Sequence, residues 1–342
     1  MKAARLHNYK KPLVIDEIPT PQPGPGQVLV KIAGSGFCHS DLHIIEGELE
    51  LPLPLPLTLG HENAGYVASI GKGVTAVREG DPVVVFGGWG CGTCGPCVSG
   101  HEQLCDNPQW AGLSKWNSGY AEDILVPKES YLVKLDKLDP IRAAPLADAA
   151  LTPYRAVKKA LPFLEPDYKA LVIGLGGLGQ YGVKFLKILC GCEIIAVDIS
   201  DEKLKIARND GAEHTLSGRD PELKDKIMDL TGGKGVCAAF DFVGSDQTLA
   251  AAVAVTRSMG KVTQVGLAGG TANLKVLANS RFEVSFEATL WGTLKELREV
   301  TALAESERLS LEETEFAPLD RINEVCERLK RGGVSGRLVV TP

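Results

Sequence analysis

Hydrophobic residues change their spacing within the segment from position 171 to position 197. An unbroken apolar run at 171–173 predicts a short buried strand. Beyond a glycine turn, apolar residues recur three or four positions apart, which is typical of a helix packed on a sheet: Leu178, Tyr181, Phe185, Leu186 and Leu189. A second strand is predicted at 193–197. The pattern therefore predicts a strand–helix–strand unit whose first turn is rich in glycine.

Strand and helix patterns continue to alternate after this unit. Helices are predicted near 201–210 and 247–256, and strands at 236–242 and 261–265. Because parallel strands are joined by crossover helices, this alternation predicts a doubly wound parallel sheet with helices on both faces.

The chain on either side of this region has a different pattern. Between Met1 and about position 143, predicted strands such as 28–32 are interrupted by Gly and Pro. Near the C-terminus, an apolar helix face at 322–329 precedes a short strand at 337–340. We therefore expect two domains, a β-rich domain formed by residues 1–144 and 293–342 and an α/β domain formed by residues 145–292.

Composition and charge narrow the classes of function. The 342 residues carry a net charge of −6 with a pI near 5.6, which argues against a nucleic-acid partner. No apolar run approaches the roughly 18 residues of a membrane helix, and the N-terminus lacks the apolar core of a signal peptide. The nine cysteines are odd in number and clustered, which argues against a disulfide framework. We therefore expect a cytoplasmic protein without a membrane partner.

The glycine turn has the composition that a pyrophosphate requires. Gly174, Gly176, Gly177 and Gly179 remove the Cβ atoms that block a close approach, and the following helix offers free N–H groups. Asp198 lies 19 residues beyond Gly179, near the separation of about 20 found in dinucleotide-binding units. The alternative is a glycine-rich turn in an ordinary α/β protein. The strand before it, the helix after it and Asp198 favour dinucleotide binding.

Four cysteines form a C-x2-C-x2-C-x7-C pattern within the segment 88–108: Cys91, Cys94, Cys97 and Cys105. Four thiolates this close in sequence can surround one tetrahedral Zn²⁺ and leave no open position, so we predict a structural zinc site. Unrelated or redox-active thiols are the alternative. The remaining cysteines, Cys190, Cys192, Cys237 and Cys326, are interpreted as buried or incidental thiols.

A second group of metal-ligand residues lies upstream. The segment G-F-C-H-S-D-L-H contains Cys38, and a G-H-E segment follows about twenty residues later with His61 and Glu62. One Cys and one His on neighbouring loops can supply two ligands of an open zinc site, which needs a third ligand and a vacant position. Either residue by itself is more often an ordinary core or surface residue.

These motifs together carry a resemblance that covers essentially the whole chain. C-H-S-D, G-H-E-N-A-G, the four cysteines, G-L-G-G-L-G and G-R-L-V-V occur in this order. The chain resembles zinc-dependent medium-chain alcohol dehydrogenases, most of all the bacterial and archaeal secondary-alcohol dehydrogenases. The resemblance implies a GroES-like catalytic domain, a Rossmann domain that binds NAD, two zinc ions per chain and a homotetramer or dimer, of which we favour the tetramer.

The resemblance implies that Cys38 and His61 bind the catalytic zinc. The family's third ligand is usually a cysteine, but this chain has Asp148 at that place and no cysteine between 105 and 190. A carboxylate is an acceptable zinc ligand and leaves the formal charge of the site unchanged. Glu62 is the competing ligand, and we favour Asp148. Asp41 is expected either to hydrogen-bond His61 or to cap its own loop.

The resemblance also implies a proton path and a cofactor site. Ser40 would accept the proton of the alcohol and pass it through the cofactor ribose, and His43 would release it to solvent. Asp198 would bind the adenosine ribose and repel a 2′-phosphate, which favours NAD over NADP. Further cofactor neighbours are implied, each with an ordinary structural role as its alternative: His39, Thr152, Leu178, Lys203 and Arg337.

The substrate pocket is predicted to be large and apolar. The resemblance implies that four residues lie near segments that border it: Trp89, Trp110, Leu290 and Trp291. A phosphate or carboxylate on the substrate would require a pair of Arg or Lys residues near the site, and the sequence offers no such pair. We therefore expect neutral aliphatic or aryl secondary alcohols, followed by primary alcohols and aldehydes. The alternatives are a polyol or other specialised zinc dehydrogenase, a zinc-free reductase, and a binding or storage protein without turnover.

Overall fold

The computed structural model describes residues 1–49, 51, 53–271, 281–332, 334 and 336–342. The chain folds into two compact units, which we call the β-rich unit (Met1–Leu151 with Trp291–Pro342) and the α/β unit (Thr152–Leu290). The divisions lie at 151/152 and 290/291, whereas the sequence pattern placed them at 144/145 and 292/293. The reason is that the 3₁₀ helix η3 (Ala144–Ala147) packs against strands of the β-rich unit, so the chain leaves that unit only after it.

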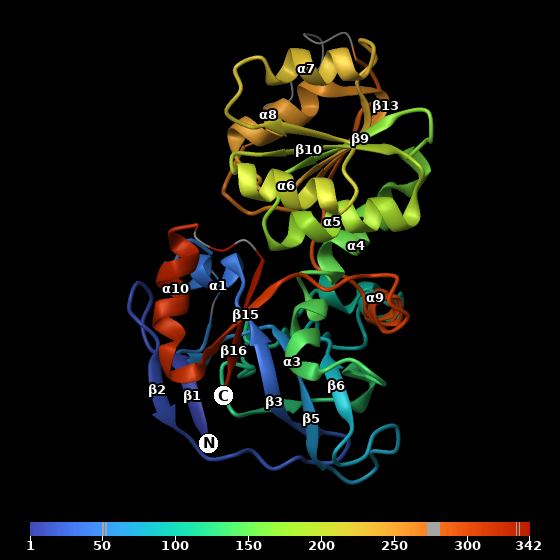
Figure 1. Ribbon diagram of the computed structural model, residues 1–342. Helices are drawn as coiled ribbons and strands as arrows, with labels where there is room; N and C mark the ends of the chain where they lie inside the picture. The colour runs from blue at the N-terminus through green and yellow to red at the C-terminus, as the bar shows by residue number, and fades with distance from the viewer. Residues whose placement is uncertain (50, 52, 272–280, 333, 335) are drawn as a thin grey trace. The chain divides into compact units, whose positions relative to one another are not determined.

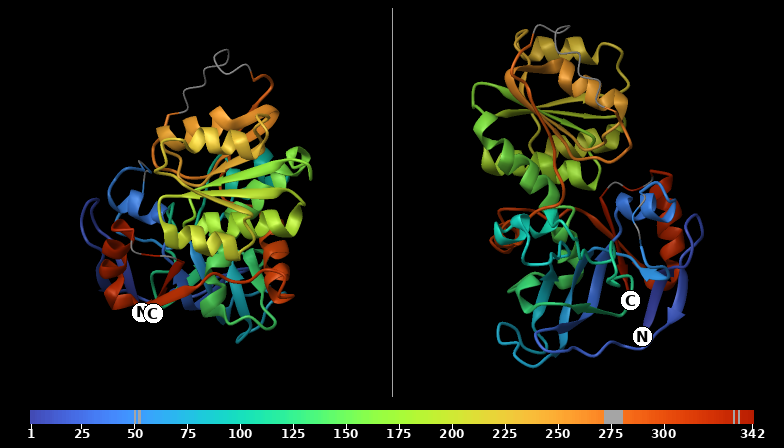
Figure 2. Two further views of the ribbon diagram at one scale, coloured as in Figure 1. Left: turned by 45° about the horizontal axis from the view of Figure 1, so that its top comes forward. Right: turned by 180° about the vertical axis from the view of Figure 1, so that it is seen from behind.

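The α/β unit is built on a six-stranded parallel sheet in the order β11-β10-β9-β12-β13-β14. Its strands are β9 (Lys169–Ile173), β10 (Glu193–Asp198), β11 (His214–Ser217), β12 (Val236–Asp241), β13 (Thr256–Gln264) and β14 (Ser285–Ala288). Its main helices are α4 (Leu151–Ala160), α5 (Gly177–Leu189), α6 (Asp201–Asn209), α7 (Leu223–Leu230) and α8 (Asp246–Val255). Figures 1 and 2 show α5 and α6 on one face of the sheet and α7 and α8 on the other. This confirms the predicted doubly wound fold.

Burial explains why the central strands read as apolar runs. β12 is buried along its whole length, and β9 from its second residue onward, because helices cover both faces. The predicted strands at 171–173, 193–197, 236–242 and 261–265 are therefore confirmed. β13 begins five residues earlier than predicted, directly after α8 ends at Val255, since its first half contains the polar residues Arg257 and Ser258.

The β-rich unit contains a seven-stranded sheet in the order β15-β16-β3-β5-β6-β8, with β7 paired to β3, and a three-stranded sheet in the order β2-β1-β4. The large sheet comprises β3 (Val28–Gly36), β5 (Glu62–Ile70), β6 (Pro82–Val85), β7 (Asp123–Val126), β8 (Leu132–Lys134), β15 (Thr314–Pro318) and β16 (Arg337–Thr341). The small sheet comprises β1 (Lys2–Leu6), β2 (Val14–Glu17) and β4 (Leu57–Thr58). Both chain termini lie in this unit (Figure 1).

The C-terminal segment completes the β-rich unit. β16 pairs antiparallel with β3, with Val339 opposite Gly36. The apolar face of α10 (Ile322–Lys330) packs with α1 (His39–Ile45) in one buried cluster, which confirms the helix predicted from the apolar positions at 322–329. The tail therefore brings Arg337 to the end of β3, where the metal-ligand residues follow.

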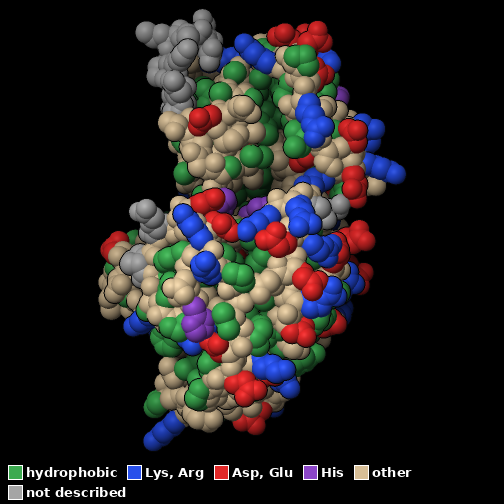
Figure 3. Space-filling model, turned by 90° about the vertical axis from the view of Figure 1, so that its left-hand side faces the viewer, with side chains coloured by type: hydrophobic (Ala, Val, Ile, Leu, Met, Phe, Trp, Pro, Cys, Tyr) green, Lys and Arg blue, Asp and Glu red, His purple; other side chains and the backbone are tan. Residues whose placement is uncertain are grey.

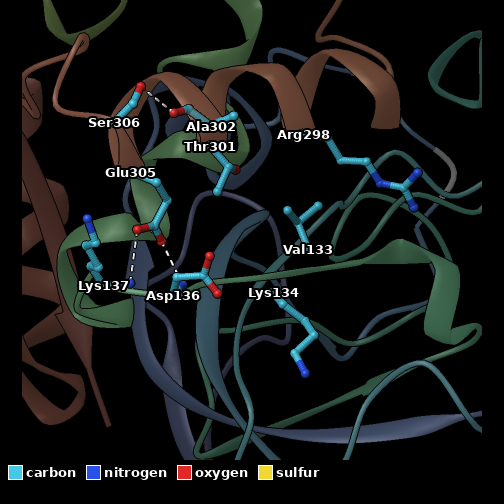
Figure 4. A pocket seen from close by; sticks show the side chains of 9 residues that line it. All are labelled: Val133, Lys134, Asp136, Lys137, Arg298, Thr301, Ala302, Glu305 and Ser306. Carbon is cyan, nitrogen blue, oxygen red and sulfur yellow. Dashed lines mark hydrogen bonds between the residues drawn. The ribbon is translucent and has the colours of Figure 1, made fainter.

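Short helices fill the connections of the β-rich unit: α2 (Gly95–Val98), α3 (Pro140–Ala143), η1 (Glu102–Leu104), η2 (Glu129–Tyr131) and η5 (Leu319–Arg321); η4 (Leu161–Phe163) belongs to the α/β unit. Helix α9 (Leu294–Glu305) ends on the loop that follows β8. There Glu305 accepts the backbone N–H groups of Asp136 and Lys137 at 2.8 and 2.9 Å, beside a hollow of about 440 Å³ (Figure 4). Since its carboxylate is used in this way, Glu305 serves to anchor the helix.

Basic and acidic side chains are interspersed over the face drawn in Figure 3. Among the described residues, no helix has the length and apolar character needed to cross a membrane.

Candidate active site and metal centres

Four side chains of the β-rich unit converge at one buried point. Cys38, His61, Glu62 and Asp148 each offer a ligand atom, and these atoms all lie within 4.8 Å of one another. Asp148 Oδ2 lies 3.6 Å from Cys38 Sγ and 3.4 Å from His61 Nε2. Exposure of these four residues is between 0 and 8%. The sulfur, nitrogen and oxygen donors that the sequence assigned to catalytic zinc are thus brought together.

Sheet pairing places these residues. Cys38 caps the start of α1 directly after β3, while Glu62 opens β5, opposite Gly36 of β3. A Cβ atom at Gly36 would lie 2.0 Å from Glu62 Oε2, so only glycine leaves room for the carboxylate here. Asp148 follows η3, which contacts β3, β5 and β6. The site therefore sits at one end of the large sheet.

The electrostatics of this group suit a cation. Burial by itself lowers the pKa of His61, but the charge of Asp41 and hydrogen bonds to Asp148 and Asp41 raise it well above 6.5. The surrounding carboxylates therefore favour positive charge at this point. His61 Nδ1 faces Asp41 Oδ1 at 3.4 Å, and Glu62 Oε2 is buried without a hydrogen-bond partner. The two negative charges of the Cys38 thiolate and the Asp148 carboxylate would balance the charge of a Zn²⁺ held by Cys38, His61 and Asp148. These residues therefore fit the metal that the sequence predicts.

Glu62 is bound to Arg337. The guanidinium of Arg337 donates to Glu62 Oε1, and both side chains are buried. Burial raises the pKa of Glu62 to about 7, against the opposing charge of Arg337. The alternative of a surface arginine is excluded, because Arg337 is 5% exposed. One oxygen of the competing ligand is therefore already occupied, whereas Asp148 faces both Cys38 and His61.

Asp41 connects the ligands to the protein behind them. Its Oδ2 accepts the N–H of Cys38 at 3.2 Å and the hydroxyl of Tyr120 at 2.8 Å, and its Oδ1 lies 3.4 Å from His61 Nδ1. The expected cap is therefore present at the start of α1, and the second oxygen of the same carboxylate faces the imidazole. Tyr120 is fully buried and stacks on Phe37 with ring centroids 5.3 Å apart. Sequence reasoning missed Tyr120, which is 79 residues from Asp41.

The residues of the predicted proton path lie on α1. Ser40 Oγ is 3.4 Å from His61 Nε2, beside the ligand group. His43 Nδ1 lies 2.5 Å from Glu48 Oε2, and its side chain is partly exposed. His39 is exposed at the first position of the helix. Ser40 is therefore close to the reacting position, while His43 faces outward with an acidic partner.

One of the three predicted pocket tryptophans, Trp291, contacts the ligand group, and a second, Trp110, lies beside Trp291. The rings of Trp291 and His61 meet edge to face, with centroids 5.5 Å apart, and Trp291 Nε1 donates to Ala147 O at 2.8 Å. The Trp110 ring centroid lies 6.4 Å from that of Trp291. Trp291 thus contacts a ligand and the residue before Asp148. Trp89 is placed differently: it is fully buried and stacks on Tyr131, so it packs in the core rather than presenting a surface. Leu290, in the α/β unit, is 37% exposed.

Three glycines of the turn in the α/β unit differ in their surroundings. Gly174 has a φ of +85°, Gly176 faces open space, and a Cβ at Gly179 would lie 1.8 Å from Gly174 O. Gly176 caps α5 without a side-chain hydrogen bond, so the helix N-terminus is left for an anion. Asp198 Oδ2 accepts the N–H of Leu175 at 2.7 Å, which fixes the carboxylate beside the turn.

Other predicted cofactor residues lie near these elements. Gly177 and Leu178 open α5 and Lys203 lies in α6, all three half-buried, while Thr152 is buried in α4.

The four-cysteine segment forms a second ligand group. Its sulfur atoms lie within 4.8 Å of one another, and those of Cys94 and Cys105 are 3.7 Å apart. The N–H groups of Cys91 and Asn107 point at Cys105 Sγ from 3.2 and 3.3 Å. A Cβ at Gly90 would lie 2.5 Å from Cys97 Sγ. The backbone thus wraps closely around four unpaired thiols, as a structural zinc site requires.

Family models match both units of the chain. An alcohol dehydrogenase GroES-like domain matches residues 24–137, and a zinc-binding dehydrogenase domain matches residues 177–306. An NAD-dependent alcohol dehydrogenase of Sulfolobus acidocaldarius is 37% identical over 99% of both chains. The chain belongs to the zinc-dependent medium-chain alcohol dehydrogenases.

Two further relatives extend this comparison. The crystal structure of the alcohol dehydrogenase from Aeropyrum pernix matches with a TM-score of 0.93 and 39% identity, covering 100% of both chains. A D-arabinose 1-dehydrogenase (NADP(+)) of Saccharolobus solfataricus is 35% identical over 100% of this chain and 97% of the relative. This dehydrogenase therefore interconverts alcohols and carbonyl compounds, and a binding or storage protein without turnover is not supported.

Proposed function

We propose that this dehydrogenase oxidises neutral, apolar secondary alcohols to ketones with NAD, and catalyses the reverse reduction. The observation that carries the proposal is the buried convergence of Cys38, His61 and Asp148 beneath Trp291. A zinc ion at these ligands supplies the Lewis acidity that lowers the pKa of an alcohol or polarises a carbonyl. The protein residues would hold the ion and take up the proton, and the Trp291 indole packs against the ligand His61.

We propose Asp148 as the third ligand of the catalytic zinc, with the second zinc in the four-cysteine group. Asp148 Oδ2 lies between Cys38 Sγ and His61 Nε2, whereas one oxygen of Glu62 is held by Arg337. Glu62 remains close enough to enter the coordination position when a ligand is exchanged. A metal count of two zinc ions per chain is expected.

Ser40 is proposed to accept the proton of the alcohol. Its Oγ is half-buried and lies beside His61 Nε2, so it adjoins the ligand group without occupying a ligand position. His43 is proposed to release the proton to solvent after it has passed through the cofactor ribose. The partial exposure of the His43 side chain and its contact with Glu48 Oε2 support this role, because the imidazole has access to solvent.

NAD is proposed as the cofactor, bound by the glycine turn with Asp198 at the ribose. The carboxylate of Asp198 is fixed by the N–H groups of Leu175 and Ser200, so it cannot easily turn away from a 2′-phosphate. Further contacts are proposed for His39, Thr152, Leu178, Lys203 and Arg337; the Nε of Arg337 is buried without a partner. A kcat/KM for NAD at least tenfold above that for NADP is expected, and the reverse order would overturn this assignment.

The substrate class rests on the aromatic side of the site. Trp291 contacts the ligand group and Trp110 lies beside it, while Arg337, a cation at this group, is paired with Glu62. The rival is an aldose or polyol, because one relative is a D-arabinose dehydrogenase. The test is a substrate panel on enzyme with two zinc ions per chain, comparing 2-butanol and 1-phenylethanol with arabinose and sorbitol. Faster NADH formation with the sugar or polyol would favour the rival.

Assembly and location are also proposals. We propose a homotetramer, with a dimer as the alternative. β14 is an edge strand, and Met259, Phe282 and Phe286 near it are exposed to between 36 and 62%, which an interface would cover. Light scattering during gel filtration decides the number of chains. A cytoplasmic location is proposed because all nine cysteines are unpaired.

A further inference from the structure

We propose that Cys190 and Cys192 form a reversible disulfide when peroxides oxidise the protein. Both lie in the α/β unit, together with Cys237, and we call these three residues the thiol cluster. Neither the zinc sites nor the glycine turn uses them. The cluster is thus a site of covalent modification separate from the active site.

Three connections converge to form the thiol cluster. Cys190 ends α5, Cys192 leads into β10 after Gly191, and Cys237 is the second residue of β12. The thiol of Cys192 interacts with those of both other cysteines, so it lies at the centre. Cys192 Sγ lies 3.1 Å from Glu165 O and Cys237 Sγ lies 3.4 Å from Lys169 O. Lys169 begins β9, whereas the glycine turn follows the other end of that strand.

Chain geometry selects the pair that can be joined. Two residues separated by one other have Cα atoms at most about 7.6 Å apart, and a disulfide needs about 4.4–6.8 Å. Chain connectivity therefore keeps Cys190 and Cys192 close to this range, and their thiols interact with each other. Gly191 is exposed, and a Cβ there would meet only Pro166 at 3.9 Å, so the backbone has room to adjust. β10 and β12 lie on opposite sides of β9, so a Cys192–Cys237 bridge would join two strands that are not neighbours in the sheet, although the two thiols interact. Such a bridge is the competing product that the experiment below detects.

Exposure and chemistry make Cys190 the attacking thiol. Cys190 is half-buried, while Cys192 and Cys237 are buried. A hydrogen bond from the Cys192 thiol outweighs the effect of burial and, with the Cys192 N–H and the charge of Lys187, lowers the pKa of Cys190 to about 7. The same contacts raise the pKa of Cys192, which remains a thiol. The Cys190 thiol donates to Leu186 O at 3.0 Å.

The proposed reaction balances with hydrogen peroxide as the oxidant. The Cys190 thiolate attacks one peroxide oxygen, the O–O bond breaks, and the departing hydroxide takes a proton to become water. The Cys192 sulfur then attacks the sulfenic sulfur and loses its proton. The S–S bond forms, the S–O bond breaks, and a second water leaves. Two electrons pass from the two sulfurs to peroxide, and an external dithiol reverses the reaction by thiol–disulfide exchange.

The test is mass mapping of the full-length, zinc-loaded protein after treatment with hydrogen peroxide. Trypsin releases residues 188–203, which contain both cysteines, and residues 235–257, which contain Cys237. After unfolding and alkylation, peptide 188–203 is expected unlabelled and two hydrogen atoms lighter, and dithiothreitol is expected to restore double labelling. Peptide 235–257 and the buried Cys326, whose pKa burial raises to about 12, are expected to stay fully labelled. A doubly labelled peptide 188–203, or one bridged to 235–257, would overturn the proposal.

Variants assign the roles within the pair. In Cys192→Ser, Cys190 is expected to stop at the sulfenic acid, which dimedone traps. In Cys190→Ser, peptide 188–203 is expected to carry one alkyl label on Cys192. Cys326→Ser is the matched control and is expected to form the disulfide as the unmodified chain does. Trapping of dimedone on Cys192 rather than Cys190 would contradict the proposed order of attack. The mass mapping of the unmodified chain tests the disulfide even where a variant fails to fold.

Discussion

The two metal-ligand groups of the β-rich unit are built in opposite ways. The four cysteines lie within residues 91–105, held by a tight backbone with N–H groups aimed at sulfur. Cys38 and Asp148 are 110 residues apart and meet only because β3, β5 and η3 pack together. The first group is closed by local chain geometry. The second needs the whole unit, which allows different donor types and an open position.

Burial explains the difference in ligand chemistry. Four thiolates leave two uncompensated negative charges around one Zn²⁺, which is tolerable where Cys91 and Cys94 are partly exposed. Cys38, His61 and Asp148 are buried, where uncompensated charge is costly, and their sum with Zn²⁺ is neutral. The nearby Glu62–Arg337 pair is also neutral. A buried reactive metal centre thus requires charge balance, which the structural site does not.

The largest expected effect is on Asp148. In Asp148→Asn, the catalytic zinc is expected to be lost while the four-cysteine zinc remains, because the anionic ligand of the open site is removed. The metal count should fall from two to one per chain, and alcohol oxidation should fall by about a thousandfold or more. Asp123→Asn is a control of the same chemistry on β7, outside the ligand group. A variant that keeps two zinc ions would instead make Glu62 the third ligand.

The converse substitution is Cys94→Ser. Loss of one thiolate should release the structural zinc and lower the free energy of unfolding by about 2–5 kcal/mol, because the short segment has little other means of closure. The folded fraction should retain its catalytic zinc. Thermal unfolding measures the change in stability, and a metal count measures the zinc that each variant retains. Cys190→Ser, at a partly exposed cysteine outside both ligand groups, is the control. Simultaneous loss of both zinc ions would show that the two groups do not form independently.

A smaller effect is expected from substitution of Asp41, whose carboxylate faces His61. In Asp41→Asn, the carboxylate facing His61 Nδ1 becomes a neutral amide, so the imidazole is less well oriented and less basic. The affinity for catalytic zinc should fall by about 10–100-fold. Competition with a chelator measures this loss, and the structural zinc in the same sample is the internal reference. Equal weakening of both sites would argue for a general loss of stability.

The smallest expected effect is on Tyr120. Tyr120→Phe keeps the ring that stacks on Phe37 and removes only the hydroxyl that donates to Asp41. Catalytic zinc should exchange about two- to tenfold faster, with the unfolding temperature changed little. Tyr131→Phe, beside the four-cysteine group, is the matched control and should leave exchange at the catalytic site unchanged. If Tyr120→Phe behaves like Tyr131→Phe, the hydroxyl does not position Asp41.

Local patterns accounted for most of the α/β unit. The apolar run of β9, the spacing along α5 and the position of Asp198 are all visible in the sequence, and the structure reproduces them. The β-rich unit was less accessible, because its strands pair in the non-sequential order β15-β16-β3-β5-β6-β8. Trp89 illustrates the limit: the resemblance implied a place at the border of the pocket, but the side chain is fully buried and stacks on Tyr131.

The sequence by itself determined the glycine turn, the four-cysteine ligand set and the family to which the chain belongs. These features depend on residues close together along the chain, where bond geometry already limits the distances. Only the tertiary structure decided that Glu62 is held by Arg337, 275 residues away, and that Tyr120 holds Asp41. The physical reason is that sheet register sets such contacts. A shift of one residue between β3 and its neighbours would turn these side chains to the opposite face.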